Sequence, residues 1–263
     1  MKVNRIYNED CLETMARMPD EFVDLTITSP PYDNLRAYNG YDFNFEHIAI
    51  ELYRVTKSGG VIVWVVCDAT VNGSETCSSF RQALYFKQCG FNLHDTMIWN
   101  KGSFTAVGSL KVRYAPTWEY MFVFSKGRPR VFNPIKDRKN KISGKIGGRL
   151  RLTDGSMRKM STDGNSRNEY GQRFGIWDIP PCGGNKSGHP APFPEQLVND
   201  HIISWSNEGD LVYDPLAGSG TTAKMSIVNS RKYIASEISK EYCEIIEVRV
   251  NGVSNQATEV VYG

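Results

Sequence analysis

The stretch that decides the fold is Leu211-Val212-Tyr213-Asp214-Pro215-Leu216-Ala217-Gly218-Ser219-Gly220-Thr221-Thr222. It begins with β-forming residues, passes through a glycine-rich turn and leads into a helical pattern. Gly218 and Gly220 allow the backbone to approach a ligand closely. Glu237 directly follows the next predicted strand, at 232–236. A carboxylate at this place can accept both hydroxyls of a ribose. The pattern predicts a cofactor that carries a nucleoside.

A plain structural turn between a strand and a helix remains an alternative for this stretch. The turn matches neither GxGxxG nor GxxxxGK[ST]. Dinucleotide hydride chemistry and ATP hydrolysis are therefore disfavoured.

A second stretch, Thr28-Ser29-Pro30-Pro31-Tyr32, follows a predicted strand at 22–27. Proline lacks the N–H that a central strand needs, so the chain must leave the sheet at Pro30. In open α/β sheets, ligands bind at the carboxyl ends of strands. The stretch is a candidate site, although Ser-Pro-Pro is also common in ordinary turns and Tyr32 alone is typical of core packing.

The remaining pattern alternates between helix and strand. Strands are predicted at 3–7, 61–66, 94–99 and 118–124, and helices at 45–55, 80–87 and 239–250. Asp10 is placed to cap a helix after the first strand, and Lys57 to Gly60 is typical of a glycine end to the helix at 45–55. This alternation predicts an α/β doubly wound, mostly parallel sheet.

Charge is distributed unevenly along the 263 residues. The net charge is +2, but residues 126–173 contain 14 Lys and Arg against 4 Asp and Glu, a local net of +10. The rest of the chain has a net charge of −8. Such asymmetry predicts a segment that binds a polyanion, with a solvated loop as the alternative.

The composition predicts a globular protein without a membrane-spanning segment. No apolar run approaches the roughly 18 residues that a membrane span needs, and residues 1–5 show no apolar signal region. Six cysteines form no CxxC pair, and four histidines are scattered. We therefore expect reduced thiols, a cytoplasmic location and no metal site.

Together these stretches resemble the β-class DNA amino-methyltransferases. Thr28 to Tyr32 is similar to their catalytic motif, and Asp214 to Thr222 to their motif for S-adenosylmethionine. Further likenesses are the acidic element at 8–12, the segment at 176–180 and the third cofactor motif at 189–194. The resemblance covers most of the chain outside 125–175, and the order of the motifs is the β-class order.

The resemblance implies a Rossmann-like methyltransferase fold with an antiparallel strand in the sheet. It divides the chain into a catalytic half at 1–125, a basic target-recognition insertion at 126–175 and a cofactor-binding half at 176–263. The implied cofactor is S-adenosylmethionine. Its candidate ligands are Asp10, Thr28, His189, Pro190, Phe193, Asp214, Pro215, Ala217, Gly218, Ser219, Gly220, Thr221, Thr222 and Glu237.

The implied reaction is transfer of a methyl group to an exocyclic amine of a flipped DNA base. The amine is a poor nucleophile because its lone pair is conjugated with the ring. The Ser29 hydroxyl and Pro30 carbonyl can accept its N–H groups, while Pro31 helps to fix the carbonyl's direction and Tyr32 stacks on the base. Candidate DNA contacts are Arg36, Arg149, Arg151, Arg158 and Lys159; base contacts cannot be separated from phosphate contacts by sequence.

The target base is left open. Serine at the head of the catalytic motif is more typical of cytosine-N4 enzymes, and aspartate of adenine-N6 enzymes, so cytosine is slightly favoured. Cytosine C5 chemistry would need a cysteine, but Cys182 lies in a glycine loop and does not end an apolar strand. An RNA methyltransferase and a catalytically silent DNA-binding protein are alternatives. A second copy of the chain and a cognate restriction endonuclease are candidate partners.

Overall fold

The computed structural model describes residues 1–31, 43–103, 110–142, 144–182 and 193–262, with side chains as far as 253. The chain divides into two compact units. The larger unit contains Met1–Asn133 and Gly175–Gly263, and the smaller unit is Pro134–Phe174. Residues 126–133 of the basic segment thus belong to the larger unit.

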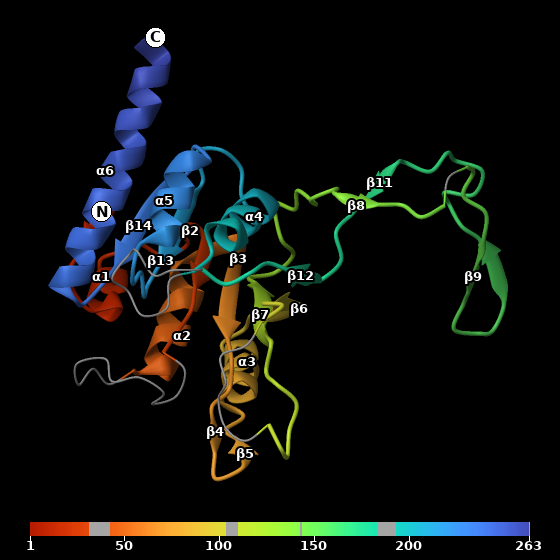
Figure 1. The fold of residues 1–263 in the computed structure, drawn as a ribbon, viewed down its shortest axis with the longest axis horizontal. Coiled ribbons are helices and arrows are strands. Elements are labelled where there is room, and N and C mark those ends of the chain that lie inside the picture. Colours follow the sequence, from red (N-terminus) through yellow and green to blue (C-terminus); the bar gives the residue numbers. More distant parts are fainter. Residues whose placement is uncertain (32–42, 104–109, 143, 183–192, 263) are drawn as a thin grey trace. The chain divides into compact units, whose positions relative to one another are not determined.

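A central sheet organises the larger unit (Figure 1). In the described part of the chain its strand order is β1-β14-β13-β2-β3-β7-β6-β12. Strand β7 is antiparallel to both neighbours, and the other pairs are parallel. The prediction of a mostly parallel sheet with an antiparallel strand is confirmed. The bounds are β1 (Arg5–Tyr7), β2 (Val23–Thr28), β3 (Thr56–Val66), β6 (Asn92–Asn100), β7 (Trp118–Ser125), β12 (Ile176–Asp178), β13 (Leu211–Asp214) and β14 (Lys232–Ser236).

Helices cover both faces of this sheet (Figure 1). One face packs against α1 (Cys11–Ala16), α2 (Phe45–Val55) and α3 (Ser78–Gln88); the other packs against α4 (Glu195–Trp205), α5 (Thr221–Val228) and α6 (Lys240–Tyr262). No helix among the described residues is long and apolar enough to span a bilayer.

Strand β3 shows why the apolar run in the sequence is continuous. Ile62, Trp64 and Val66 enter the core on the α1–α3 side. Val61, Val63 and Val65 enter the core on the opposite side, against α4. Successive side chains of a strand point to opposite faces, so a strand covered on both faces is apolar at every position.

The predicted glycine end of α2 is wrong. Helix α2 ends at Val55, and Thr56 is already extended and begins β3. Gly59 instead has a φ of +77° inside this strand, and a Cβ there would lie 3.0 Å from the Cβ of Arg130. The missing side chain of Gly59 thus allows the backbone of β3 to lie close to the segment that contains Arg130. The local sequence does not reveal this contact.

Other boundaries differ in smaller ways. Helix α6 continues to Tyr262, beyond the expected end near 250. Pro194 is the residue before α4, with ψ at 130°. An additional hairpin, formed by β4 (Thr70–Val71) and β5 (Ser74–Glu75), turns at Asn72 and Gly73, both with positive φ. Such a dipeptide favours a two-residue hairpin turn.

The smaller unit contains two antiparallel strand pairs. Strand β8 (Arg138–Lys139) pairs with β11 (Tyr170–Gly171), and β9 (Arg149–Arg151) pairs with β10 (Met157–Lys159). Arg173 pairs with Asp137, and its backbone N–H bonds the Ile135 carbonyl at 2.9 Å. These contacts close the two ends of the unit on each other. Its strands are too short to show alternation along the sequence.

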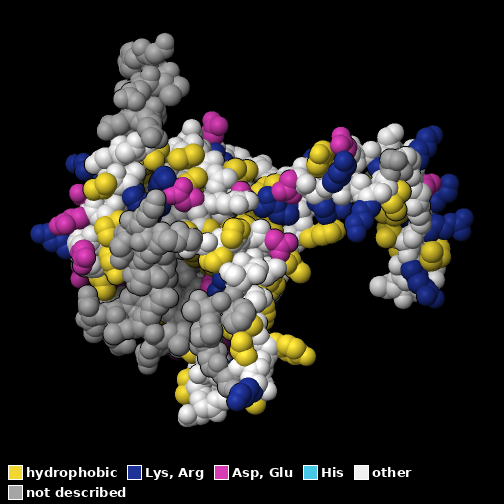
Figure 2. Space-filling view, in the orientation of Figure 1, with side chains coloured by type: hydrophobic (Ala, Val, Ile, Leu, Met, Phe, Trp, Pro, Cys, Tyr) yellow, Lys and Arg dark blue, Asp and Glu magenta, His cyan; other side chains and the backbone are white. Residues whose placement is uncertain are grey.

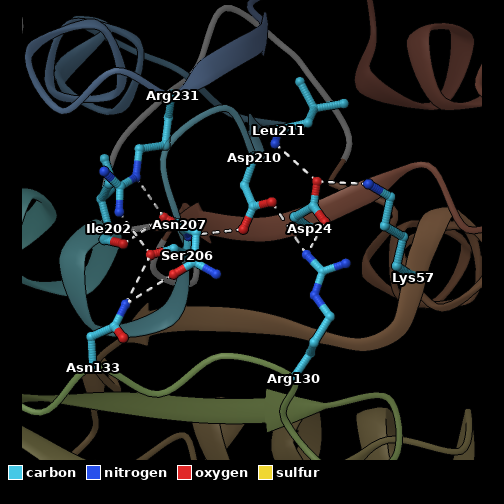
Figure 3. Close-up of polar contacts among 10 residues, drawn as sticks. All are labelled: Asp24, Lys57, Arg130, Asn133, Ile202, Ser206, Asn207, Asp210, Leu211 and Arg231. Carbon is cyan, nitrogen blue, oxygen red and sulfur yellow. Dashed lines mark hydrogen bonds and ion pairs between the residues drawn. The ribbon is translucent and has the colours of Figure 1, made fainter.

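Asp24 anchors the amino-terminal edge of the sheet (Figure 3). This buried carboxylate, at the start of β2, accepts the backbone N–H of Leu211 in β13 at 2.9 Å. It also accepts Lys57 at 2.7 Å and Arg130 at 2.5 Å, and Arg130 extends to Asp210 at 3.3 Å. One carboxylate therefore joins β2, β3, β13 and the segment after β7.

The segment after α4 is fastened beside this network. The carbonyl of Ser206 accepts the side chains of Asn133 at 3.2 Å and Arg231 at 2.7 Å (Figure 3). These bonds satisfy a buried backbone group that the end of the helix would otherwise leave unpaired.

We expect Asp24→Ala to lower the free energy of unfolding by ~2–4 kcal/mol, because the buried Leu211 N–H and two cations lose their acceptor. Urea unfolding measures this loss. Asp20→Ala is the matched control: Asp20 pairs with Arg54 at 2.8 Å, but its side chain is 74% exposed. Its loss should be below about 1 kcal/mol. Equal losses in the two variants would contradict the anchoring role of Asp24.

Candidate active site

The carboxyl ends of the parallel strands place both sequence motifs at one edge of the sheet. Ser29 and Pro30 follow β2, Asp214 ends β13, and Glu237 follows β14. Strands β2 and β13 are direct neighbours, with Leu25 opposite Val212. Polar groups at such an edge are where open α/β sheets bind ligands.

A buried hydrogen bond joins the two motifs. The Thr28 hydroxyl donates to the Asp214 carboxylate at 2.8 Å, across 186 positions of sequence. The same carboxylate oxygen accepts the backbone N–H of Leu216 at 3.1 Å, which holds the first bend of the glycine turn. Thr28 and Asp214 thus act here as positioning residues between the two motifs.

Burial raises the pKa of Asp214 to about 6, although hydrogen bonds from Thr222, Thr28 and the Leu216 N–H each lower it. Among the described residues these partners are neutral groups, and a buried carboxylate without a cation carries a desolvation cost. Asp214 is therefore ionised at neutral pH but costs free energy in that state.

The catalytic motif is described only in part. Ser29 is half-buried, Pro30 is buried and Pro31 is half-buried immediately after β2. The residue before them, Thr28, lies opposite Trp64 of β3. Strand β2 ends at Thr28, before Pro30, beside β3, which continues to Val66. Tyr32 and Arg36 lie outside the described residues, as do His189 and Pro190 of the third motif.

The glycine turn is closed by Glu237. Its carboxylate accepts the Gly218 N–H at 2.8 Å through one oxygen and the Ser239 N–H at 2.9 Å through the other. Burial raises the pKa of Glu237, and the bonds from Ser239 and Gly218 offset part of the shift. An ionised carboxylate has about four acceptor sites, so each oxygen retains acceptor capacity for a further donor.

Gly220 has a structural role that the sequence did not show. It precedes α5 with a φ of +74°, and a Cβ there would lie 2.5 Å from Cγ2 of Ile246 in α6. The absent side chain makes room for a neighbouring helix. Gly218 also has a positive φ, at 53°, but its role is closure with Glu237.

Three charged residues that hold the turn have no signal in the local sequence. Arg249 of α6 donates to the carbonyl of Ser219 at 2.6 Å and to Glu195 at 2.9 Å, and Lys224 donates to Glu195 at 2.6 Å. Burial raises the pKa of Glu195, but Lys224 and then Arg249 outweigh it, and the net shift is downward. Glu195 lies 29 positions from Lys224 and 54 from Arg249, so the three residues share no local motif.

Other predicted cofactor ligands have structural partners. Asp10 caps α1, accepting the Leu12 N–H at 2.7 Å. The Phe193 carbonyl accepts the Thr221 hydroxyl at 3.4 Å, and its ring packs against the core beneath α4. The Ala217 N–H bonds the Ser236 carbonyl, and both Pro215 and Ala217 are buried in the turn.

Asp68 follows the apolar strand β3. Its carboxylate accepts the Ser79 N–H at 2.9 Å and the Ser79 hydroxyl at 2.6 Å, at the start of α3. Asp68 therefore satisfies a first-turn N–H of α3 from outside the helix, whose N-cap residue is Cys77.

The predicted DNA contacts that are described lie in the smaller unit. Arg149 and Arg151 are in β9, Arg158 and Lys159 are in β10, and all four are exposed. Residues 134–174 contain 11 Lys and Arg and 4 Asp and Glu, a net of +7. Lys and Arg side chains gather over this unit (Figure 2).

Comparison with known proteins gives the family. A family model described as DNA methylase, for N6 and N4 methyltransferases, matches residues 23–248. The chain belongs to this DNA methylase family. The match includes the catalytic motif, the glycine turn and the basic segment between them.

Individual relatives agree with this membership. The orphan methyltransferase M.BamHII of Bacillus amyloliquefaciens is 59% identical over 238 residues, covering 87% of this chain and 88% of its own. The structure of PvuII DNA methyltransferase (cytosine-N4-specific) matches with a TM-score of 0.70 at 20% identity, covering 98% of this chain and 92% of its own. A putative DNA modification methylase of Thermus thermophilus, complexed with S-adenosyl-L-methionine, matches with a TM-score of 0.63 at 22% identity, covering 95% of each chain. The two structural likenesses show a common fold.

The raised pKa of Asp214 predicts a pH-dependent stability. The folded-state value of about 6 lies above the ordinary value of 3.8. The stability that the protonated Asp214 carboxyl contributes is therefore fully present below about pH 4. This stability is lost as pH rises through 6, by about 3 kcal/mol in total. Asp214→Asn keeps an acceptor oxygen and removes the titration. The unfolding free energy of wild type minus that of Asp214→Asn, from urea titrations at several pH values, should fall over this window; a constant difference would contradict it.

The packing of Gly220 predicts a second effect on stability. Gly220→Ala should cost ~2–4 kcal/mol of unfolding free energy, because backbone strain adds to the clash with Ile246. Gly209→Ala is the control, since its φ is +82° but a Cβ would meet nothing within 4 Å. It should cost only ~1 kcal/mol. Adding Ile246→Ala to Gly220→Ala removes the clash, and a double-mutant cycle without coupling would show that the contact is unimportant.

Proposed function

We propose that this DNA methylase transfers a methyl group from S-adenosylmethionine to the exocyclic amine of a flipped DNA base, with cytosine N4 favoured over adenine N6. One observation carries the proposal: the hydrogen bond from Thr28 to Asp214 holds Ser29-Pro30 and the glycine turn at one edge of the sheet. Two neighbouring strand ends can thus serve a base and a methyl donor in a common site.

The residues of the turn suit a cofactor that carries a nucleoside. Gly218 has no Cβ, and the Glu237 carboxylate behind it retains acceptor capacity on both oxygens. Ribose hydroxyls are donors that such a carboxylate would accept. S-adenosylmethionine would carry the methyl group on its sulfonium sulfur: as the N–CH3 bond forms, the S–CH3 bond breaks, the sulfur leaves as a neutral thioether, and the amine releases one proton. A complex with this compound in a protein of the same fold supports the assignment.

The catalytic motif suits activation of an amine. Ser29 and Pro30 present a hydroxyl and a carbonyl oxygen, both acceptors for N–H groups. Two acceptors would draw the nitrogen toward tetrahedral geometry and free its lone pair. Pro30 and Pro31 restrict the backbone, so the acceptors are fixed before the base arrives. Tyr32 would stack on the base after it leaves the duplex.

The base preference rests on Ser29. The family model includes both N6 and N4 enzymes, so membership leaves the base open. Serine at this position favours cytosine N4, and the structural likeness to a cytosine-N4-specific enzyme is compatible with it. Adenine N6 is the alternative.

The smaller unit suits contact with the DNA substrate. Its net charge is +7 and most of its Lys and Arg side chains are exposed, whereas the rest of the chain is acidic overall. Cations that neutralise phosphates release counterions, which drives binding of any duplex. The division into catalytic, target-recognition and cofactor segments, a homodimer and a cognate endonuclease stay predictions.

The purified chain should transfer a labelled methyl group from S-adenosylmethionine to duplex DNA, and mass spectrometry of digested nucleosides should show N4-methylcytosine. N6-methyladenine would overturn the base preference. Methylation of RNA alone, or of neither nucleic acid, would overturn the proposed function.

Ser29→Ala should lower kcat by roughly 10²–10³-fold, as the loss of one preorganised transition-state contact does elsewhere. Tyr32→Ala should lower kcat/KM by roughly 5- to 150-fold, because stacking on a base is lost. Ser74→Ala, on the exposed β4–β5 hairpin, is the control and should leave the rate unchanged. Full activity of Tyr32→Ala would exclude the stacking role.

A further inference from the structure

Local chemistry builds a defined ribbon from β9 and β10. The turn between them is Leu152-Thr153-Asp154-Gly155-Ser156. The Gly155 N–H bonds the Leu152 carbonyl at 2.9 Å, the Leu152 N–H bonds the Ser156 carbonyl at 2.8 Å, and Gly155 has a φ of +84°. The Asp154 carboxylate accepts the Ser156 N–H at 2.9 Å. This is a three-residue hairpin loop with a glycine bulge, which fixes the strand register.

The register sorts the cations of the ribbon onto two faces. Arg149 lies opposite Lys159, Arg151 opposite Met157, and Leu150 opposite Arg158. Directly opposite residues share a face, and successive residues alternate. One face therefore carries Arg149, Arg151, Lys159 and Met157, and we name it the arginine face. Arg158 and Leu150 are on the reverse face.

The side chains of the two arginines on this face are available to bind a ligand. Among the described residues, neither Arg149 nor Arg151 has a hydrogen bond or ion pair with its side chain. Lys159 lies 3.6 Å from Asp163 and is partly neutralised. Arg173 and Arg138 of the same unit are committed internally, to Asp137 and to the Gln172 carbonyl. The unit thus separates cations that hold it together from cations left for a ligand.

The dimensions of the arginine face match the DNA major groove. The groove is ≈ 12 Å wide and admits a two-stranded ribbon, which lays one face against the base edges. Residues two apart on a strand are ~6.8 Å apart, close to the rise of two base pairs. Arginine forms paired hydrogen bonds with O6 and N7 of guanine, and exposed Met157 offers an apolar contact to a thymine methyl group.

We propose that the ribbon of β9 and β10 enters the major groove with its arginine face toward the bases, and that Arg149 and Arg151 select guanines one to two base-pair steps apart. Arg158, on the reverse face, contributes charge but no base selection. This inference rests on the proposed function, since it assumes a DNA substrate, and it identifies specificity-determining residues within the basic segment.

The test uses the full-length chain and a library of duplexes randomised in sequence. Wild type, Arg149→Ala, Arg151→Ala and Arg158→Ala are compared by sequencing the methylated molecules and, separately, the bound molecules. The three variants lose the same charge from the same exposed hairpin, so Arg158→Ala is a matched control. Thermal unfolding of each variant shows that the fold is intact.

The wild-type site should contain guanines with the stated spacing. Arg149→Ala and Arg151→Ala should each lower the preference for one of these guanines by roughly 5- to 150-fold. Arg158→Ala should keep every preference, with at most a uniform loss of binding and a salt slope lower by about 0.9. A site without guanine, retained preferences in both face variants, or an equal relaxation in Arg158→Ala would overturn the proposal.

The two readouts separate this proposal from the proposed function. If wild type binds a guanine-containing sequence selectively but transfers no methyl group, the proposed function fails. The ribbon proposal is then tested by the sequences of the bound molecules alone. If methyl transfer occurs with a site that neither arginine affects, the ribbon proposal fails and the proposed function stands. If wild type binds no duplex, both fail.

Discussion

The site depends on the pairing of β2 with β13 and on the buried hydrogen bond from Thr28 to Asp214 that completes it. Thr28 belongs to the strand that delivers Ser29 and Pro30, and Asp214 belongs to the strand that delivers the glycine turn. Parallel pairing places the carboxyl ends of both strands at the same edge, and the hydrogen bond joins their last residues. Without this constraint the motifs would have no common place in the molecule.

At their other end the same two strands are joined by a hydrogen bond in the opposite sense, in which β13 donates and β2 accepts. There Asp24 of β2 accepts the backbone N–H of Leu211 in β13, supported by Lys57 and Arg130. Asp24 thus has cations as partners, whereas Asp214 has hydroxyl and N–H groups and carries the desolvation cost seen in its raised pKa. Within the described residues, the anchor away from the site is electrostatically balanced, whereas the Asp214 carboxylate at the functional edge has neutral partners.

The basic part of the chain follows a different physical principle. The larger unit has a continuous two-faced core, whereas the smaller unit is held by short ribbons, an Arg173–Asp137 pair and Arg138 over Phe174. Exposed segments with few buried contacts can change sequence at little cost in stability. Under the proposed function, the residues of this unit that contact DNA can therefore change while the β2–β13 site is retained, which suits a family that includes both N6 and N4 enzymes.

The sequence by itself determined the elements with strong periodicity or turn chemistry: β3, α2, β14, the break at Pro30 and the glycine turn. It also showed that residues 126–173 concentrate positive charge. Only the tertiary structure decided that Gly220 makes room for Ile246, that Arg249 holds Ser219, and that Arg151 and Arg158 face opposite ways. The reason is that periodicity and turns are local properties, whereas close approach, ion pairing and strand register depend on residues far apart in the chain.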